Sequence, residues 1–413
     1  MTSRNLLGLL ALALCASAED RLRLEDLIPE VLRANPEIGA AQKRYEAARQ
    51  RPPQESSLPE PMLSLGYTSS GSPRPFAGLG REPVANAGVM VSQEFPFPGK
   101  RKLRGEIAAR EAEADFQQYQ AVQLSVVARV QQAFHRLHYA WTAREVLARN
   151  RDLLRQVLRA TEARYAVGKA QQQDIFKAQT QLSILETRLA KLAQEQRSRE
   201  AELNSLLGRP VGSPLARPAD LAPAPLHLSL AELLAQARDH APMLQREEKM
   251  VQRAQLAVNL ARKEYYPDYT LSAGVYHMGA MPSMYMARVD FKLPAWFWGK
   301  QRAGVAEEVG NLSQARHNLA AAGQTLAFRL QDDYLMAETS YRLTEMYSGT
   351  VIPQSNLALQ SSLASYETGG VDFLTVLANL TAVLDYELNY QEELQSYFLA
   401  LARLEEMTGV SLT

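Results

Sequence analysis

Residues 106–167 contain neither glycine nor proline, and this stretch limits the possible folds of the 413-residue chain more than any other. About 60 residues form a helix of roughly 90 Å at about 1.5 Å per residue. A helix of that length needs partners along its whole course, as in a coiled coil. Leucines between residues 182 and 206 recur at alternating spacings of three and four and supply a packing seam. We therefore expect a long helical hairpin.

The same hairpin pattern occurs a second time. Its first tip is Arg164–Gln179 (RYAVGKAQQQDIFKAQ) and its second is Ser365–Asn379 (SYETGGVDFLTVLAN). Aligning Gly168 with Gly369 also aligns the tyrosines three residues before each glycine. The order helix, helix, strand pair, long hairpin recurs over nearly the whole chain, which indicates an internal two-fold repeat.

Short extended segments precede each hairpin. The first pair is Met62–Thr68 and Ala85–Phe95, and the second is about Tyr269–His277 and Met284–Phe291. Each is about as long as a tilted strand that crosses a bilayer. Four strands cannot close a barrel, so in a membrane several chains would have to share one. The alternative, a soluble sheet whose aromatic side chains form a core, stays open on the pattern alone.

The N-terminus predicts export. Arg4 is followed by an apolar run, Leu6–Leu14, and then by Ala16-Ser17-Ala18, which predicts a signal peptide cleaved after Ala18. Lipidation of Cys15, the only cysteine, is the alternative. Cleavage after Ala18 would leave a mature chain with no disulfide and no thiolate nucleophile. No later run of apolar residues reaches the length of about 18 that a transmembrane helix requires.

These signals divide the chain as follows. The prediction is a signal peptide at 1–18, a first repeat at 19–213 (strand pair 61–95, hairpin 100–208), a proline-rich linker at 214–226, and a second repeat at 227–413 (strand pair 268–293, hairpin 300–409). Within the repeats, Asn35-Pro36 interrupts the first helix and a second helix ends at Pro52-Pro53. Gly349 and Pro353 break the helical run of the second repeat.

Composition excludes several function classes. The formal net charge is +0, so no bulk field attracts nucleic acid. A basic stretch at residues 129–164 is interleaved with acids, which favours pairing between helices or a solvated face. Its eight arginines are Arg129, Arg136, Arg144, Arg149, Arg151, Arg155, Arg159 and Arg164. No catalytic triad or carboxylate dyad stands in a recognisable context, so we expect neither an enzyme nor a cofactor.

Two groups of residues have metal-ligand chemistry. His135 and His138 lie three residues apart on the long helix, where a solvated helix face is the favoured interpretation. Thioethers select soft Cu(I) or Ag(I), and five residues around the second strand pair are candidates: His277, Met278, Met281, Met284 and Met286. The alternative for these methionines is packing or contact with lipid, so no metal site is predicted.

At this point the chain resembles the TolC-type outer-membrane efflux channel family, the outer membrane factors. The resemblance lies in NPEI (35–38), PEPMLSLGY (59–67), VSQEFPFPGKR (91–101) and the YAVG and YETG tips, and it extends from about Leu22 to the C-terminus. The PFPGKR junction is most similar to the heavy-metal and cation-efflux branch. The resemblance implies an α+β membrane protein: a homotrimer whose helical hairpins form a periplasmic α-barrel and whose protomers each add four strands to one 12-stranded transmembrane β-barrel.

The family resemblance also implies partners and no catalysis. An inner-membrane efflux pump would supply the energy, and a periplasmic adaptor would dock between the tips at Val167, Gly168, Thr368 and Gly369. The channel would passively conduct metal cations or drugs through the outer-membrane lipid to the exterior. The functional alternative is that the chain is itself a periplasmic adaptor, which normally has one hairpin flanked by small β domains.

A gate is implied at the same tips. Asp174 matches a family aspartate near the closed end of the tunnel, and Tyr366 matches a tyrosine that latches to it in the closed state. Asp372 lies close to the family's acidic ring but out of register with it. Val371 occupies the position of an arginine in the best-known pattern, so we expect less charge in this gate. The structural alternative for Asp174 is a helix N-terminal acid.

Overall fold

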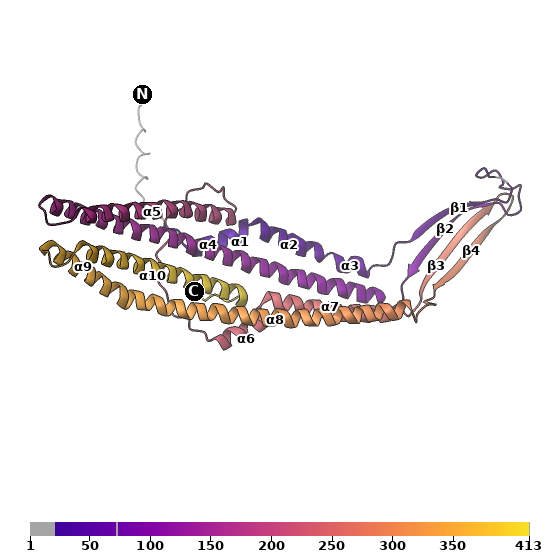
Figure 1. Ribbon diagram of the computed structural model, residues 1–413. Coiled ribbons are helices and arrows are strands. Elements are labelled where there is room, and N and C mark those ends of the chain that lie inside the picture. Colours follow the sequence, from indigo (N-terminus) through magenta and orange to yellow (C-terminus); the bar gives the residue numbers. More distant parts are fainter. Residues whose placement is uncertain (1–20, 72, 413) are drawn as a thin grey trace, which may run out of the picture. The chain divides into compact units, whose positions relative to one another are not determined.

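The computed structural model describes residues 21–71 and 73–412. The predicted signal peptide and Cys15 lie outside the described residues. The elements along the chain are α1 (Leu24–Ala34), α2 (Pro36–Ala48), α3 (Arg51–Ser56), β1 (Met62–Thr68), β2 (Asn86–Phe95), α4 (Lys100–Ala166), α5 (Gln172–Leu206), α6 (Leu230–His240), α7 (Pro242–Lys263), β3 (Asp268–Met278), β4 (Met281–Lys292), α8 (Lys300–Met346), the π-helical η1 (Tyr347–Val351), α9 (Ile352–Thr368) and α10 (Phe373–Thr408) (Figure 1). This order repeats helices, strand pair and hairpin, as expected.

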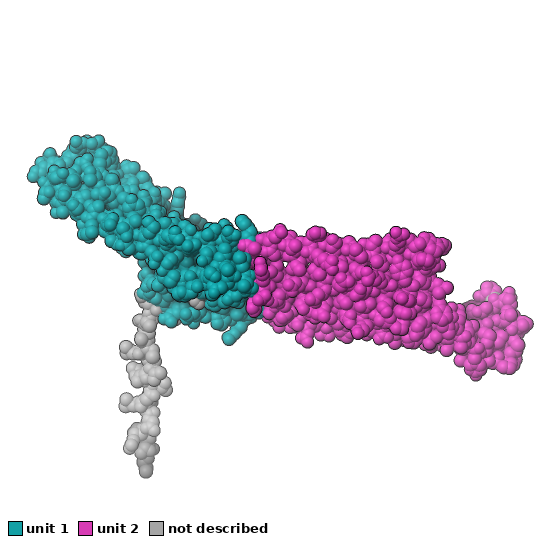
Figure 2. Space-filling view, turned by 90° about the horizontal axis from the view of Figure 1, so that it is seen from below, with its two compact units in different colours: residues 1–38, 123–237, 328–413 teal, residues 39–122, 238–327 magenta. Residues whose placement is uncertain are grey.

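The chain forms two compact units, coloured separately in Figure 2. Unit 1 contains residues 1–38, 123–237 and 328–413, and unit 2 contains residues 39–122 and 238–327. Each unit therefore combines segments of both sequence repeats. Helices α4 and α8 contribute to both units.

Unit 1 is built on four helices with a shared apolar core. Leu154 of α4, Leu185 of α5, and Leu380 and Leu384 of α10 are buried in one cluster that also takes in Leu359 of α9. The seam leucines of residues 182–192 pack against the same cluster. The two hairpins, α4 with α5 and α9 with α10, are thus held together by the side chains that recur at three and four residues.

Unit 2 contains a four-stranded antiparallel sheet in the order β1-β2-β3-β4. The expected strand pairs are present, and β2 joins β3 so that the two repeats meet in the middle of the sheet. Figure 1 shows the four strands side by side. Helices α7 and α8 pack through Ala254, Val258 and Leu312.

No helix within residues 21–71 and 73–412 has both the length and the apolar character that crossing a membrane requires.

Two expected helix breaks are wrong. The second helix, α2, already ends at Ala48, before Pro52-Pro53, and these prolines lie in the first turn of a separate helix, α3, where a missing N–H costs little. Gly349 and Pro353 do not break the helical run of the second repeat. The backbone widens into the π-helical turn η1 and continues as α9, because a π-turn accommodates the extra residue and the missing donor of Pro353. The break at Asn35-Pro36 is confirmed.

Candidate functional site

Each hairpin tip reverses at a glycine in the left-handed region. Gly168 has φ of 72° and Gly369 has φ of 87°, which a side chain would strain. After the first glycine, the Lys169 N–H donates to the Arg164 carbonyl at 2.8 Å; after the second, the Gly370 N–H donates to the Ser365 carbonyl at 2.7 Å. Both tips therefore end their helices with the same Schellman motif, which satisfies the last carbonyls.

The helix that follows each tip begins with a side-chain cap. In the first tip Gln171 caps α5 and Asp174 reaches back to the Gln171 N–H at 3.3 Å. In the second, Asp372 caps α10 and accepts from the Thr375 N–H at 2.9 Å and from its hydroxyl at 2.5 Å. The acid thus occupies the third helical position in one tip and the cap position in the other.

These caps show what the two predicted gate acids do locally. Asp174 is half-buried and Asp372 is exposed. The Thr375 hydroxyl and N–H, together with the nearby positive charge of Lys177, lower the pKa of Asp372. Asp372 is therefore ionised at neutral pH. The structural role that we considered for Asp174 is present, and its gate role remains a prediction.

Arg164 joins the two tips within one chain. Its Nη1 donates to the carbonyls of Tyr366, in a short contact, and Glu367, at 3.0 Å. Its guanidinium carbon lies 4.5 Å from the centroid of the Tyr366 ring. A cation at the C-terminus of α9 interacts favourably with the carbonyls there and with the helix dipole. The repeat places Ser365 at the position of Arg164, so the second tip has no equivalent side chain.

Tyr366 is buried and bonds to the first hairpin. Its hydroxyl lies 3.1 Å from the hydroxyl of Thr161, which is fully buried on α4. The ring packs at an angle to Phe373, with centroids 6.3 Å apart. Within the described chain Tyr366 is therefore joined to Thr161 and Arg164. In the sequence Arg164 stands in a basic stretch and nothing distinguishes Thr161, because no local pattern indicates a partner about 200 residues away.

The predicted adaptor-contact residues are at the surface. Val167, Gly168, Thr368 and Gly369 are all exposed. Exposed apolar side chains lie in and near these turns along the chain: Tyr165, Val167, Phe176 and Leu374. An exposed apolar patch beside ordered turns is typical of a protein interaction site.

The strand register gives the sheet two chemically different faces. One, the apolar face, carries nine large exposed side chains: Leu63, Leu65, Val89, Val91, Leu271, Val275, Tyr285, Val289 and Phe291. The other, the polar face, carries Ser64, Thr68, Asn86, Ser92, Glu94, Thr270, Ser272, Arg288, Asp290 and Lys292. A soluble sheet would bury its apolar face; this one exposes it, as a strand facing lipid does.

Aromatic side chains gather where the strands meet the helices. Phe95, Tyr269 and Phe291 lie directly opposite one another on β2, β3 and β4, and the first two rings stack with centroids 5.4 Å apart. The neighbouring Trp296, Phe297 and Trp298 are exposed, as is Tyr266. Such a row is typical of a membrane–water interface. The alternative that these aromatics form a soluble core is wrong, because most of them are exposed.

A buried lysine joins the two repeats beside this aromatic row. Lys100, the first residue of α4, is 1% exposed, and its Nζ lies 2.9 Å from Asp268, 3.0 Å from Glu264 and 3.1 Å from the Tyr266 carbonyl. The Phe97 N–H donates to the same Asp268 oxygen at 2.7 Å. The PFPGK motif of the first repeat is therefore anchored on the start of the second repeat's first strand.

The metal-ligand candidates are separated by the register. His277 lies on the apolar face, whereas Met284 and Met286 lie on the polar face. Met286 shares that face with Met90, on either side of Gly274. Met278 and Met281 pair near the turn. Among the described residues no three His, Cys, Asp or Glu side chains gather as a metal-binding group.

His135 and His138 are buried, so their assignment to a solvated face is wrong. His135 stacks on Phe398 of α10 with ring centroids 4.8 Å apart. Burial lowers the pKa of His135 to about 3 and that of His138 to about 4. Both imidazoles are neutral members of the unit 1 core.

Acid is therefore expected to destabilise the protein through these histidines. In the unfolded chain the two imidazoles take up protons near pH 6.5. In the folded chain they do so only near pH 3 to 4. Their contribution to the free energy of unfolding is therefore fully present above about pH 6.5. It falls as the pH decreases, by up to about 1.4 kcal/mol per pH unit for each histidine. His135→Phe keeps the stacking volume and should flatten the pH dependence of the thermal midpoint between pH 4 and 6.5. An identical slope in variant and wild type would contradict this account.

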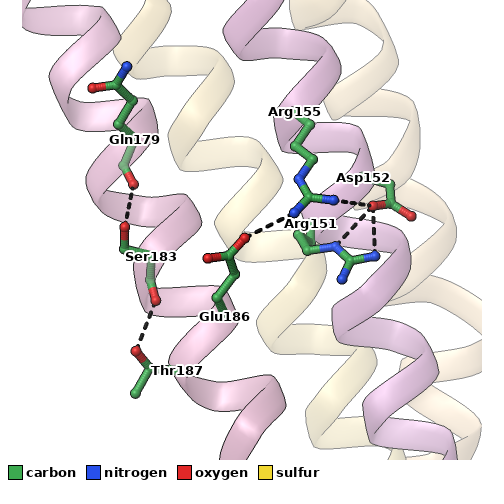
Figure 3. A network of polar contacts seen from close by, with 7 residues as sticks. All are labelled: Arg151, Asp152, Arg155, Gln179, Ser183, Glu186 and Thr187. Atoms are coloured by element: carbon green, nitrogen blue, oxygen red, sulfur yellow. Dashed lines mark hydrogen bonds and ion pairs between the residues drawn. The ribbon is translucent and has the colours of Figure 1, made fainter.

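Several arginines of the 129–164 stretch pair between helices, which is one of the two expected environments. Arg155 of α4 contacts Glu186 of α5 at 2.9 Å, while Asp152 bridges Arg151 and Arg155 (Figure 3). Arg129 pairs with Glu37, and Arg149 with Glu387. Most of these side chains are partly exposed, so each pair contributes little to stability.

A sequence profile described as "outer membrane efflux protein" matches residues 27–209 and 233–410, which is most of the chain and follows the two repeats. The protein belongs to this family. As an outer membrane efflux protein it is located in the outer membrane with a periplasmic extension, and the family consists of channels.

Two relatives match this outer membrane efflux protein over most of its length. One is the cobalt-zinc-cadmium resistance protein CzcC of Cupriavidus metallidurans, 20% identical over 94% of this chain and 90% of its own. The other is the pyoverdine export outer membrane protein OpmQ of Pseudomonas aeruginosa, 23% identical over 94% of this chain and 84% of its own. The solved structure of the outer membrane protein VceC of Vibrio cholerae is also similar, with a TM-score of 0.79 and 17% identity over 94% of this chain and 97% of that chain. This likeness shows a shared fold.

Proposed function

We propose that the protein is the outer-membrane channel of a tripartite export system, which passively conducts substrates delivered by an inner-membrane pump and a periplasmic adaptor. The exposed apolar face of the sheet is the observation that carries this proposal. In water, nine exposed large apolar side chains on one face would be an aggregation hazard; in lipid they are the stabilising surface. The proposal includes a homotrimer, in which three copies contribute twelve strands to one transmembrane barrel.

The hairpin tips are the proposed docking site for the adaptor. The exposed side chains of Tyr165, Val167, Phe176 and Leu374 lie in and near two glycine turns, which Schellman hydrogen bonds close. A partner that uses a helical hairpin could lay an apolar face on this patch. A periplasmic adaptor, the alternative identity, is disfavoured because two hairpins accompany a sheet whose apolar face is open.

Substrate choice is proposed to reside in the pump. One relative is named for cobalt, zinc and cadmium resistance and the other for pyoverdine export, so similar channels are associated with different cargoes. Deleting the gene and measuring susceptibility to these metals and to drugs would identify the cargo class.

Membrane fractionation of the full-length protein tests the function. We expect recovery in the outer-membrane fraction as a trimer that migrates as a single species on a gel before heating and as a 45.9 kDa monomer or slightly smaller after heating. Recovery as a water-soluble monomer would overturn the proposal.

Asp372 provides a test of ion selection at the tips. In a trimer three exposed carboxylates would concentrate negative charge at one mouth. Asp372→Asn removes the charge but keeps a good helix cap. The reversal potential of the reconstituted channel in a salt gradient should shift toward that of a less cation-selective pore. Asp174→Asn is the matched variant in the first tip; an unchanged reversal potential in both would exclude an acidic selectivity ring.

A further inference from the structure

The helices of unit 2 border an open hollow on one side of α4. Its volume is about 420 Å³, within the range of about 300–1,000 Å³ that is usual for small-molecule sites. Its floor is α4, where Ala109 and Ala112 have no side chain beyond Cβ. One turn earlier α3 packs tightly, since a Cβ added to Gly105 would lie 2.9 Å from the Cβ of Ser56. The hollow therefore opens beside the turn between α2 and α3.

One wall of the hollow is aromatic. Tyr45 of α2 and Phe116 of α4 contact each other, with ring centroids 5.0 Å apart. Both residues are partly exposed, so the rings border the hollow and are not sealed inside a core. The guanidinium carbon of Arg49 lies 5.7 Å from the centroid of the Tyr45 ring. Such a wall favours a flat apolar group, because aromatic rings and guanidinium groups stack on planar partners.

The charged side chains that line the hollow have a net positive charge. Lys249 of α7 lies 2.8 Å from Glu113 of α4, and Arg110 contacts the same carboxylate at 2.7 Å. Two cations thus already neutralise Glu113. Arg49 is exposed and forms no ion pair within residues 21–71 and 73–412. An anion in the hollow would meet Arg49 directly and would share Lys249 with Glu113.

A buried hydrogen-bond acceptor lies at one end of the hollow. Gln117 is the last residue of α4 in its lining and is 9% exposed. No donor among the described residues reaches the side-chain oxygen of Gln117. Buried polar atoms in folded proteins almost always have a partner, so this oxygen favours a ligand that carries an N–H or O–H group.

We propose that the hollow binds a small aromatic carboxylate that carries a hydroxyl group at the opposite end of its ring. The carboxylate pairs with Arg49 and Lys249, and the hydroxyl donates to Gln117. The ring lies over the alanine floor, against the aromatic wall. All of the lining residues belong to unit 2 of one chain, so this inference goes beyond the proposed export function and does not depend on it.

The spacing along α4 fits a ligand with one ring. Lys249 contacts α4 at Glu113, and Gln117 is four residues further along the helix. That separation is a rise of about 6 Å at about 1.5 Å per residue. The two polar groups of 4-hydroxybenzoate stand at opposite ends of one benzene ring, which matches this rise.

Titration of the purified full-length protein with 4-hydroxybenzoate tests the site. Isothermal titration calorimetry should show saturable binding of one ligand per chain. Benzoate lacks the hydroxyl and phenol lacks the carboxylate; benzoate should bind about fivefold more weakly and phenol about tenfold more weakly. The absence of saturable binding, or equal affinity for all three compounds, would overturn the proposal.

Substitutions at the two polar ends assign the contacts. Arg49→Gln should weaken binding of 4-hydroxybenzoate about tenfold, and Gln117→Leu should bind 4-hydroxybenzoate and benzoate equally. Arg44→Gln is the matched control, because Arg44 is another exposed residue near the end of α2 but pairs with Asp115 at 2.9 Å outside the hollow. Equal loss of affinity in Arg44→Gln and Arg49→Gln would show a diffuse charge effect and no site.

Filling the floor gives a test that removes no polar group. Ala109 is partly exposed, so Ala109→Leu should fold, keep the wild-type thermal midpoint and lose binding of 4-hydroxybenzoate. Ala109→Ser, which adds little volume, should retain binding. Unchanged binding in Ala109→Leu would overturn the site. Loss of the site with a trimer still recovered in the outer membrane would leave the proposed function intact, whereas recovery as a water-soluble monomer would overturn that function alone.

Discussion

Lys100→Ala is expected to lower the free energy of local unfolding at the junction between β2 and α4 by about 3 kcal/mol. Removing one partner of a buried ion pair leaves the other charge uncompensated. Asp268 is only 13% exposed and would keep a carboxylate without its lysine, whereas Glu264 is exposed enough to be rehydrated. Hydrogen exchange reports this directly, since the Phe97 N–H donates to Asp268. Peptides covering residues 94–102 should exchange about a hundredfold faster, at about 1.4 kcal/mol per factor of ten.

Lys102→Ala is the matched control for this prediction. Lys102 lies in the same first turn of α4, is 80% exposed and is 3.7 Å from Glu106 four residues on. A surface pair of this kind contributes at most about 0.5 kcal/mol. Exchange in Lys100→Ala within threefold of Lys102→Ala would show that the buried contact does not hold the junction.

Arg164→Ala is expected to release the second tip from the first. The variant loses a cation–π contact and charged hydrogen bonds to two carbonyls at the end of α9, together worth about 2 kcal/mol. Local opening of residues 365–372 should then become about 30-fold more frequent by hydrogen exchange. If the tips form the mouth of the channel, single-channel conductance should rise as well.

Two further variants identify the cause of the change at the tip. Arg159→Ala removes a nearby exposed arginine that has no side-chain partner within residues 21–71 and 73–412, and it should leave exchange at the second tip unchanged. Arg164→Lys keeps the positive charge but loses the planar guanidinium with its several N–H donors. Its hydrogen exchange at the second tip should therefore lie between that of the wild type and that of Arg164→Ala. Equal exchange in Arg164→Ala and Arg159→Ala would contradict a role for Arg164 in joining the tips.

Much of the fold was predictable because local chemistry decided it. Alternation of apolar and polar residues located the strand pairs to within a few residues. Gly168 and Gly369 marked the two turns because each needs a positive φ. The repeat then supplied the order of elements. Pro52 and Pro353 misled the prediction, because a proline is also compatible with a helix's first turn and with a π-turn.

The contacts at the candidate site were less predictable. Arg164 and Tyr366 are about 200 residues apart, and nothing near either residue indicates the other. The buried environment of His135 comes from Phe398 of α10, so a spacing pattern on α4 alone suggested a solvated face. The two faces of the sheet could be assigned only once the strand register was known. That register places His277 on one face and Met284 and Met286 on the other.

Current through the purified protein in a planar lipid bilayer tests the channel assignment most directly. We expect discrete, small conductance steps that need no energy source, and larger steps from Arg164→Ala. A trimer that inserts into the bilayer but carries no current, in the wild type and in Arg164→Ala alike, would contradict it.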